Sequence, residues 1–271
     1  MVKTDIFEPL RAKGYQVEFH SHARAILLTD FTKPMRELIE VLNNVTIPIE
    51  EIVASGGGEA KGTQRLRRAL FDKGWKKGRF KIVKWINDVE RESVTHEIDH
   101  VRTMPDGTVL VLEIEWNNKD PFFDRDLENF KRLHAEGAIS AGILVTRGIS
   151  LQANLRTLVR RFAEQGSVNS FADLKPYGVE PTVRQRGAVE KRTTRSKQPL
   201  SFRDAWTEHF VSDKFGTATT HWAKLEDRIG RGVGNPCPLL AIGLPDSIVT
   251  FHETKEALAE IAEVEEGDEG D

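Results

Sequence analysis

One short apolar segment constrains the fold of this chain more than any other feature. Residues 138–146 read AISAGILVT, and such a run predicts a strand that is covered on both of its faces. The preceding segment, residues 123–136, has apolar residues at helical spacing and ends at Gly137. A strand that returns after such a helix predicts an α/β fold, with a mixed β-sheet flanked by helices.

The hydrophobic pattern predicts further elements of the same fold. Turn residues separate these elements, and Ser55 to Gly58 form the strongest break in the first part of the chain. We expect strands at 80–88, 95–104, 108–117 and 238–244, a further strand over 17–28, a helix that Asp30 caps and that runs through Leu42, and helices over 59–72 and 150–165.

Charge is distributed unevenly along the 271 residues, whose net charge is −3. Residues 252–271 hold nine acidic residues and one lysine, a net charge of −8, which leaves about +5 for residues 1–251. We expect the acidic tail to be disordered and the remainder to be compatible with a nucleic-acid partner. Residues 183–197 hold six basic residues and one acid, which indicates either a linker or a mobile loop that contacts phosphate.

Several classes of protein are excluded by composition. No run of about 18 apolar residues is present, and the N-terminal segment has no apolar signal core. The single cysteine, Cys237, rules out an internal disulfide and a cysteine-based zinc cage. We therefore expect a cytoplasmic protein.

The turn Pro105-Asp106-Gly107 lies between two segments of high β propensity and predicts a hairpin. A three-residue loop places Met104 opposite Thr108, and so Asp99 opposite Glu113. Alternation then predicts one face with Glu97, Asp99, Val101, Val111, Glu113 and Glu115, and a core face with Ile98, Leu110, Leu112, Ile114 and Trp116.

The first of these faces gathers carboxylates among apolar residues. Opposed acids on neighbouring strands repel, so they raise one another's pKa or capture a cation. Mg²⁺ prefers carboxylate oxygens, and a bound Mg²⁺ suits the hydrolysis of phosphodiesters. The alternative is a solvated polar face of an edge hairpin, with the acids pointing into water.

A second motif overlaps the hairpin. His96-Glu97-Ile98-Asp99-His100 matches H-E-x-x-H, the signature of zinc proteases, which requires both histidines on one helical turn. The flanking β-branched residues and the turn at Pro105 favour a strand instead, on which the two histidines would share a face.

Asp99 followed by Glu113-Ile114-Glu115 resembles the PD-(D/E)xK nuclease motif, in the variant with glutamate in place of lysine. The chain is similar to type II restriction endonucleases of the BamHI/BglII group over about residues 50–245. Residues 116–127, Thr220-His221-Trp222 and residues 231–238 carry the rest of the resemblance.

The resemblance implies a Mg²⁺-dependent enzyme that hydrolyses double-stranded DNA at a short palindromic site. It also implies a homodimer, with a cognate methyltransferase as a genetic partner. The expected organisation is an N-terminal region with the nuclease core in 1–180, a basic linker or loop in 181–200, a segment 201–251 that completes the domain and recognises DNA, and the acidic tail.

Catalytic roles follow from the same resemblance. Asp99 and Glu113 would hold Mg²⁺, and Glu115 would stand where lysine usually orients the attacking water. Glu59, at the start of the 59–72 helix, is a further candidate acid, although an acid at a helix N-terminus is also favoured by the helix dipole.

DNA contacts are expected from polar residues near strand ends and from the segment 213–235, although each has an ordinary turn or capping alternative. A sequence-nonspecific repair nuclease of the same fold and a non-catalytic DNA-binding protein remain alternatives. The candidate DNA-binding residues are Asn117, Asn118, Lys119, Arg147, Lys214, His221, Arg228 and Arg231.

Overall fold

The computed structural model describes residues 5–54 and 60–251. These residues fall into two compact units, each built from separate parts of the chain. The first comprises the chain up to Val45, Thr63–Ile149 and Thr219–Pro245, and the second comprises Thr46–Gly62, Ser150–Ala218 and the residues from Asp246 onward.

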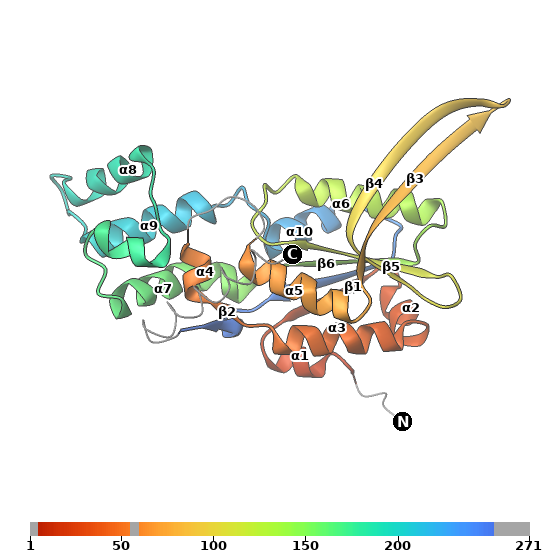
Figure 1. The fold of residues 1–271 in the computed structure, drawn as a ribbon, viewed down its shortest axis with the longest axis horizontal. Helices are drawn as coiled ribbons and strands as arrows, with labels where there is room; N and C mark the ends of the chain where they lie inside the picture. The colour runs from red at the N-terminus through yellow and green to blue at the C-terminus, as the bar shows by residue number, and fades with distance from the viewer. Residues whose placement is uncertain (1–4, 55–59, 252–271) are drawn as a thin grey trace. The chain divides into compact units, whose positions relative to one another are not determined.

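A six-stranded mixed sheet forms the centre of the first unit (Figure 1). The three central strands β5, β6 and β7 run parallel, and the outer strands pair antiparallel. This arrangement confirms the predicted α/β class. In spatial order the strands are β1 (Gln16–His20), β7 (Leu239–Leu244), β6 (Ala141–Arg147), β5 (Val109–Glu115), β4 (Val89–Thr103) and β3 (Lys76–Ile86).

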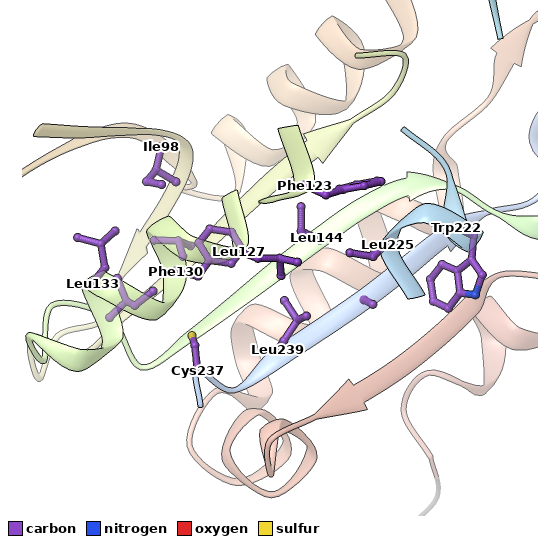
Figure 2. Close-up of a cluster of buried hydrophobic side chains, with 13 residues drawn as sticks. Ile98, Phe123, Leu127, Phe130, Leu133, Leu144, Trp222, Leu225, Cys237 and Leu239 are labelled. Carbon is purple, nitrogen blue, oxygen red and sulfur yellow. The ribbon is translucent and has the colours of Figure 1, made fainter. Parts of the chain in front are cut away.

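The hydrophobic core lies between this sheet and two helices, α6 (Phe122–Ala135) and α10 (Trp222–Gly230). Every residue of β6 is buried, as the apolar run predicted. Figure 2 shows the α6 side chains packed over Leu144 of β6 and beside Leu225 of α10. Each fully buried leucine or phenylalanine contributes about 1.5–3 kcal/mol, so this layer fixes α6 against β5.

Four more helices belong wholly or largely to the first unit. They are α1 (Glu8–Ala12), α2 (Ala23–Thr29), α3 (Thr32–Asn44) and α5 (Lys61–Asp72). Figure 1 shows α1 and α3 on the side of the sheet opposite to α6. The sheet is therefore covered by helices on both faces, as a parallel centre requires.

Strands β3 and β4 form a long hairpin, called the arm below. Only His100–Thr103 of β4 pair with β5, whereas the pairing of β4 with β3 continues out to Ile86 and Val89. Asn87 and Asp88 close the arm with positive φ angles of 51° and 61°, typical of a two-residue hairpin turn. The arm thus extends beyond the rest of the sheet (Figure 1).

The second unit is mostly helical. Phe162 of α7 packs edge-on against Tyr177 and lies near Trp206 of α9, which builds a separate apolar core. Among the described residues, no helix is long and apolar enough to cross a membrane. The elements are β2 (Ile47–Pro48), α4 (Ile49–Val53), α7 (Ile149–Gln165), a 3₁₀ helix (Ala172–Tyr177), α8 (Val183–Thr193), α9 (Phe202–Lys214), a 3₁₀ helix (Asp246–Ile248) and β8 (Val249–Thr250).

Two predictions about local structure are wrong. The strand expected over 17–28 ends at His20, and α2 follows after Ser21 and His22, both in the left-handed region. The predicted linker at 183–197 contains helix α8 instead. Thr182 accepts a hydrogen bond from the backbone of Gln185, whose side chain accepts one in return from the Thr182 backbone, and this capping box starts the helix.

The close approach of α6 to β6 yields a prediction about Gly142. A Cβ at this position would overlap the Phe130 ring, so Gly142→Ala should lower the free energy of unfolding by about 1–3 kcal/mol. The control is Gly187→Ala in α8, where a Cβ meets no atom within 4 Å and should leave stability equal or raise it slightly. Urea unfolding of both variants measures the change in the free energy of unfolding. Equal changes in the two variants would contradict the close contact between Gly142 and Phe130.

Candidate active site

The turn between β4 and β5 sets the register of the hairpin. The Met104 amide donates to the Thr108 carbonyl at 2.8 Å, and His100 lies opposite Leu112. Asp99 is next in this register, and its amide donates to Glu113 Oε1 at 3.4 Å. The predicted juxtaposition of Asp99 and Glu113 is confirmed.

A β-bulge in β4 changes the predicted faces. The pairing with β3 shifts by one residue between Ile98 and Val101. Ile98 therefore lies on the α6 side, buried in the same cluster as Val111, and not on the opposite face as predicted (Figure 2). Glu97 consequently points away from α6, where it pairs with Lys77 at 3.4 Å. The predicted place of Glu97 on the carboxylate face is also wrong.

The same bulge separates the two histidines of the H-E-x-x-H string, which lies on strand β4. His96 faces α6, where burial and then the charge of Arg132 lower its pKa, whereas a hydrogen bond with Asn129 opposes the shift. His100 Nδ1 lies 3.2 Å from the Leu112 carbonyl, and burial and Arg67 of α5 lower its pKa. The histidines share neither a helix nor a face, so the string is not a zinc protease site.

Three acidic side chains are buried where β5 meets α6. Glu113 and Glu115 point from β5 toward the helix and are 5% and 2% exposed. Asp126 of α6, only 1% exposed, faces them and shares a hydrogen bond with Glu115. Asp99 borders the group, and its charge acts on both Glu113 and Asp126. These four residues are called the carboxylate cluster.

Burial and mutual repulsion make these acids weak. Burial, together with the charges of Asp126 and Asp99, raises the pKa of Glu113 to about 10. Burial and Asp126 raise the pKa of Glu115 to about 8. Burial likewise raises the pKa of Asp126, although Arg125 opposes the shift. In the protein alone, Glu113 and Glu115 therefore hold protons at neutral pH.

Two polar side chains orient the cluster. Arg125 Nε donates to Asp126 Oδ1 at 2.8 Å, and its guanidinium lies 3.4 Å from Glu115 Oε1. Asn118 Nδ2 donates to Glu115 Oε2 at 2.7 Å. Both oxygens of Glu115 thus accept hydrogen bonds, and these bonds fix the orientation of the carboxylate.

The donor chemistry of the cluster fits a hard divalent cation. Asp126 Oδ2 is buried and has no hydrogen-bond partner in the described part of the chain. No three His, Cys, Asp or Glu side chains among the described residues converge as a ready-made cage. Mg²⁺ does not require such a cage, because it often takes one or two carboxylates and completes its shell with water and substrate phosphate.

The comparison with known families decides the class of protein. Residues 15–244 match the family described as restriction endonuclease BglII/BglIII. The chain belongs to this family. It is a restriction endonuclease with DNA as its substrate, and its mixed sheet flanked by helices agrees with the fold expected of such a nuclease. No curated protein matches the chain.

Arg147 of the endonuclease has a structural position and not the predicted DNA-binding one. Its side chain is fully buried, and its guanidinium donates to the Trp116 carbonyl, the Thr219 hydroxyl and the Thr220 carbonyl at 2.6–2.8 Å. Burial lowers its pKa to about 9, so it stays charged at neutral pH. Arg147 therefore joins the segment after β5 to the segment before α10.

Two more predicted DNA contacts are occupied inside the protein. Arg228 of α10 is 9% exposed and binds Asp124 and Asp120, which fastens α10 to α6. In the second unit, Lys214 donates to the carbonyls of Ile52 and Ala54 at the end of α4. Burial lowers the pKa of Lys214 to about 8. Both side chains therefore have partners inside the protein.

The other sequence candidates have different surroundings. Lys119 is exposed and its backbone bridges to Thr219, whereas Arg231 is exposed and pairs with Asp227 at 3.0 Å. Asn117 is half-buried and His221 precedes α10. Glu59 lies outside the described residues.

Asp126 is the site residue that the sequence analysis missed. It lies on the buried stripe of α6, which is formed by Phe123, Asp126, Leu127, Phe130 and Leu133. An acid on the apolar face of an amphipathic helix needs a partner, because burial of an unpaired charge is costly. The acidic residue within an otherwise apolar stripe was therefore the sequence signal that could have identified Asp126 as a site residue.

The raised pKa values predict how stability depends on pH when metal is absent. Glu113 ordinarily titrates at 4.5, so between that value and about 10 the folded state binds more protons than the unfolded state. The free energy of unfolding should therefore fall as the pH rises from about 5 to 8 in EDTA, by an amount that Glu113→Gln reduces. Urea unfolding at several pH values measures it. Glu97→Gln is the exposed control, and identical curves for both variants would contradict the burial.

Proposed function

We propose that this restriction endonuclease hydrolyses phosphodiester bonds of double-stranded DNA at a short palindromic site and depends on Mg²⁺. The observation that supports this is the register of the hairpin, which puts the Asp99 backbone against the Glu113 carboxylate. Asp99 is exposed and Glu113 is buried, so a cation held between their oxygens would also be accessible to a phosphate of DNA.

Asp99 and Glu113 are the residues that would hold Mg²⁺. When bound, the ion would activate water and stabilise the charge that develops on the phosphate. Glu113 must lose its proton to bind a cation, and a cation in turn would stabilise the ionised carboxylate. Burial and the charge of Asp126 raise the pKa of Glu113, so both oppose its ionisation until a cation binds.

Glu115 takes the place at which the motif usually has lysine. A carboxylate cannot stabilise phosphate charge as an ammonium does, but it can accept a proton from the attacking water or bind a metal ion. The donors Asn118 and Arg125 keep one orientation of the Glu115 carboxylate. Arg125 also favours the ionised form of Glu115, which is the form that a base needs.

A homodimer fits a palindromic site, because a twofold axis presents one active site to each strand. Host DNA would need protection from such an enzyme, so a cognate methyltransferase is the expected genetic partner. The exposed residues Asn118, Lys119 and Arg231 remain candidates for DNA contact.

Substitutions in the cluster test the proposal. Asp99→Asn and Glu113→Gln should each reduce the rate of plasmid cleavage at least about 100-fold. Each variant loses a ligand of the metal ion, which stabilises the transition state by several kcal/mol, and every 1.4 kcal/mol corresponds to a factor of about ten in rate. DNA binding should persist in both variants. The matched control is Glu97→Gln, which alters an exposed acid on the same strand, outside the cluster, and should cleave like the wild type.

The pattern of cleavage separates the alternatives. A site-specific enzyme gives discrete fragments with Mg²⁺ and none with EDTA, whereas a sequence-nonspecific nuclease gives a smear. DNA binding without any cleavage would indicate a non-catalytic protein. Normal cleavage by Asp99→Asn would show that the site lies elsewhere.

A further inference from the structure

A strongly basic segment includes strand β3, which pairs with β4, the strand whose Asp99 borders the carboxylate cluster. Residues 63–86, which form most of α5 and all of β3, contain nine lysine and arginine residues and one aspartate. Their net charge is therefore +8, whereas the rest of the chain carries −11 to give the total of −3. An asymmetry of this size indicates a polyanionic partner for this segment.

The arm presents part of this charge on one face. Phe80 and Ile82 of β3 pack against the core on the α6 side, so the alternating residues Arg79 and Lys81 point to the other face. Arg79 lies opposite Glu97, which also points away from α6. Helix α5 lies on that same side, since its Arg67 acts on His100.

Arg79 and Lys81 are accessible. Both are exposed, and no acidic side chain of the described residues pairs with either of them. Their neighbours on β3 differ in this respect, because Lys77 pairs with Glu97 and Lys84 pairs with Glu92 and Glu136. Arg79 and Lys81 therefore keep their charge for an external ligand.

The position of these residues relates them to the proposed cleavage site. Arg79 is one strand away from β4 and two residues beyond the level of Asp99, which corresponds to about 8 Å between backbones. From Arg79 the arm continues to Ile86, roughly a further 23 Å. A duplex that reaches the exposed Asp99, at the border of the cluster, would extend past a structure of this length.

We propose that the arm face with Arg79 and Lys81 contacts the phosphate backbone of DNA that flanks the cleavage site. The inference rests on the proposed function and adds a sequence-independent contact surface outside the carboxylate cluster. Pairing of β3 with a second copy of this chain is disfavoured, because lysines on an edge strand oppose such addition. The surface thus fits a duplex better than it fits another sheet.

Salt dependence of binding tests this surface. The full-length Arg79→Ala/Lys81→Ala variant and the wild type are titrated in EDTA against a labelled duplex of about 40 base pairs over a range of salt concentrations. Loss of two phosphate contacts should reduce the slope of log K against log salt by about 1.8. The charge-retaining variant Arg79→Lys/Lys81→Arg should keep the wild-type slope.

The control is Lys33→Ala/Arg36→Ala, which removes the same charge from exposed positions on α3. An unchanged slope for the arm variant, or an equal change for the α3 control, overturns the inference. Thermal unfolding verifies that each variant is folded.

Cleavage assays keep the two proposals distinguishable. With Mg²⁺ and saturating plasmid, the arm variant should retain the wild-type kcat and show a raised KM, because it leaves the carboxylate cluster intact. If the wild type fails to cleave, the proposed function fails while the salt slope still tests the arm. If the wild type cleaves and the arm variant shows an unchanged slope and KM, only the arm inference fails.

Discussion

Burial of acidic side chains between β5 and α6 is the constraint on which the rest of the first unit depends. Each ionised carboxylate in that position would cost several kcal/mol unless it gained a proton or a cation. The apolar stripe of α6, with Phe123, Leu127 and Phe130 fully buried, supplies the opposing free energy. The same helix that stabilises the sheet therefore carries Asp126 into the site. Helix α6 therefore links the stability of the first unit to its affinity for a cation, because it provides both the apolar stripe and Asp126.

The turn chemistry made half of the site predictable, since Pro105-Asp106-Gly107 determined the register and hence the pairing of Asp99 with Glu113. The bulge after Ile98 was missed although one signal was present, because Gly78 lies opposite Ile98 at the shift in register and an isolated glycine in a strand often marks a bulge. It reversed the expected faces of Glu97 and Ile98. Helix α8 was missed for another reason, as its stability comes from capping and not from an apolar stripe.

Basic residues were the least predictable part of the site. Arg147 and Arg228 have the side chains expected of DNA-binding residues, yet each is consumed by internal acceptors. Sequence does not distinguish a guanidinium that bridges loops from one that meets phosphate, because both uses exploit the same fork of donors. Only burial and partners separate the two uses. Arg147 nevertheless contributes to the site indirectly, because it holds the segment that contains Asn118, the donor to Glu115.

Net charge is a poor guide to the partner of this chain. The total of −3 combines a segment of +8 in residues 63–86 with a segment of −8 in residues 252–271. A duplex at the active site responds to the local potential within about a Debye length, roughly 8–10 Å at physiological salt. The strand β3 lies within that distance of β4, whose Asp99 borders the buried acids. Positive charge at this distance offsets the repulsion between DNA and the carboxylates, so an acidic catalytic cluster and a basic flank are physically complementary.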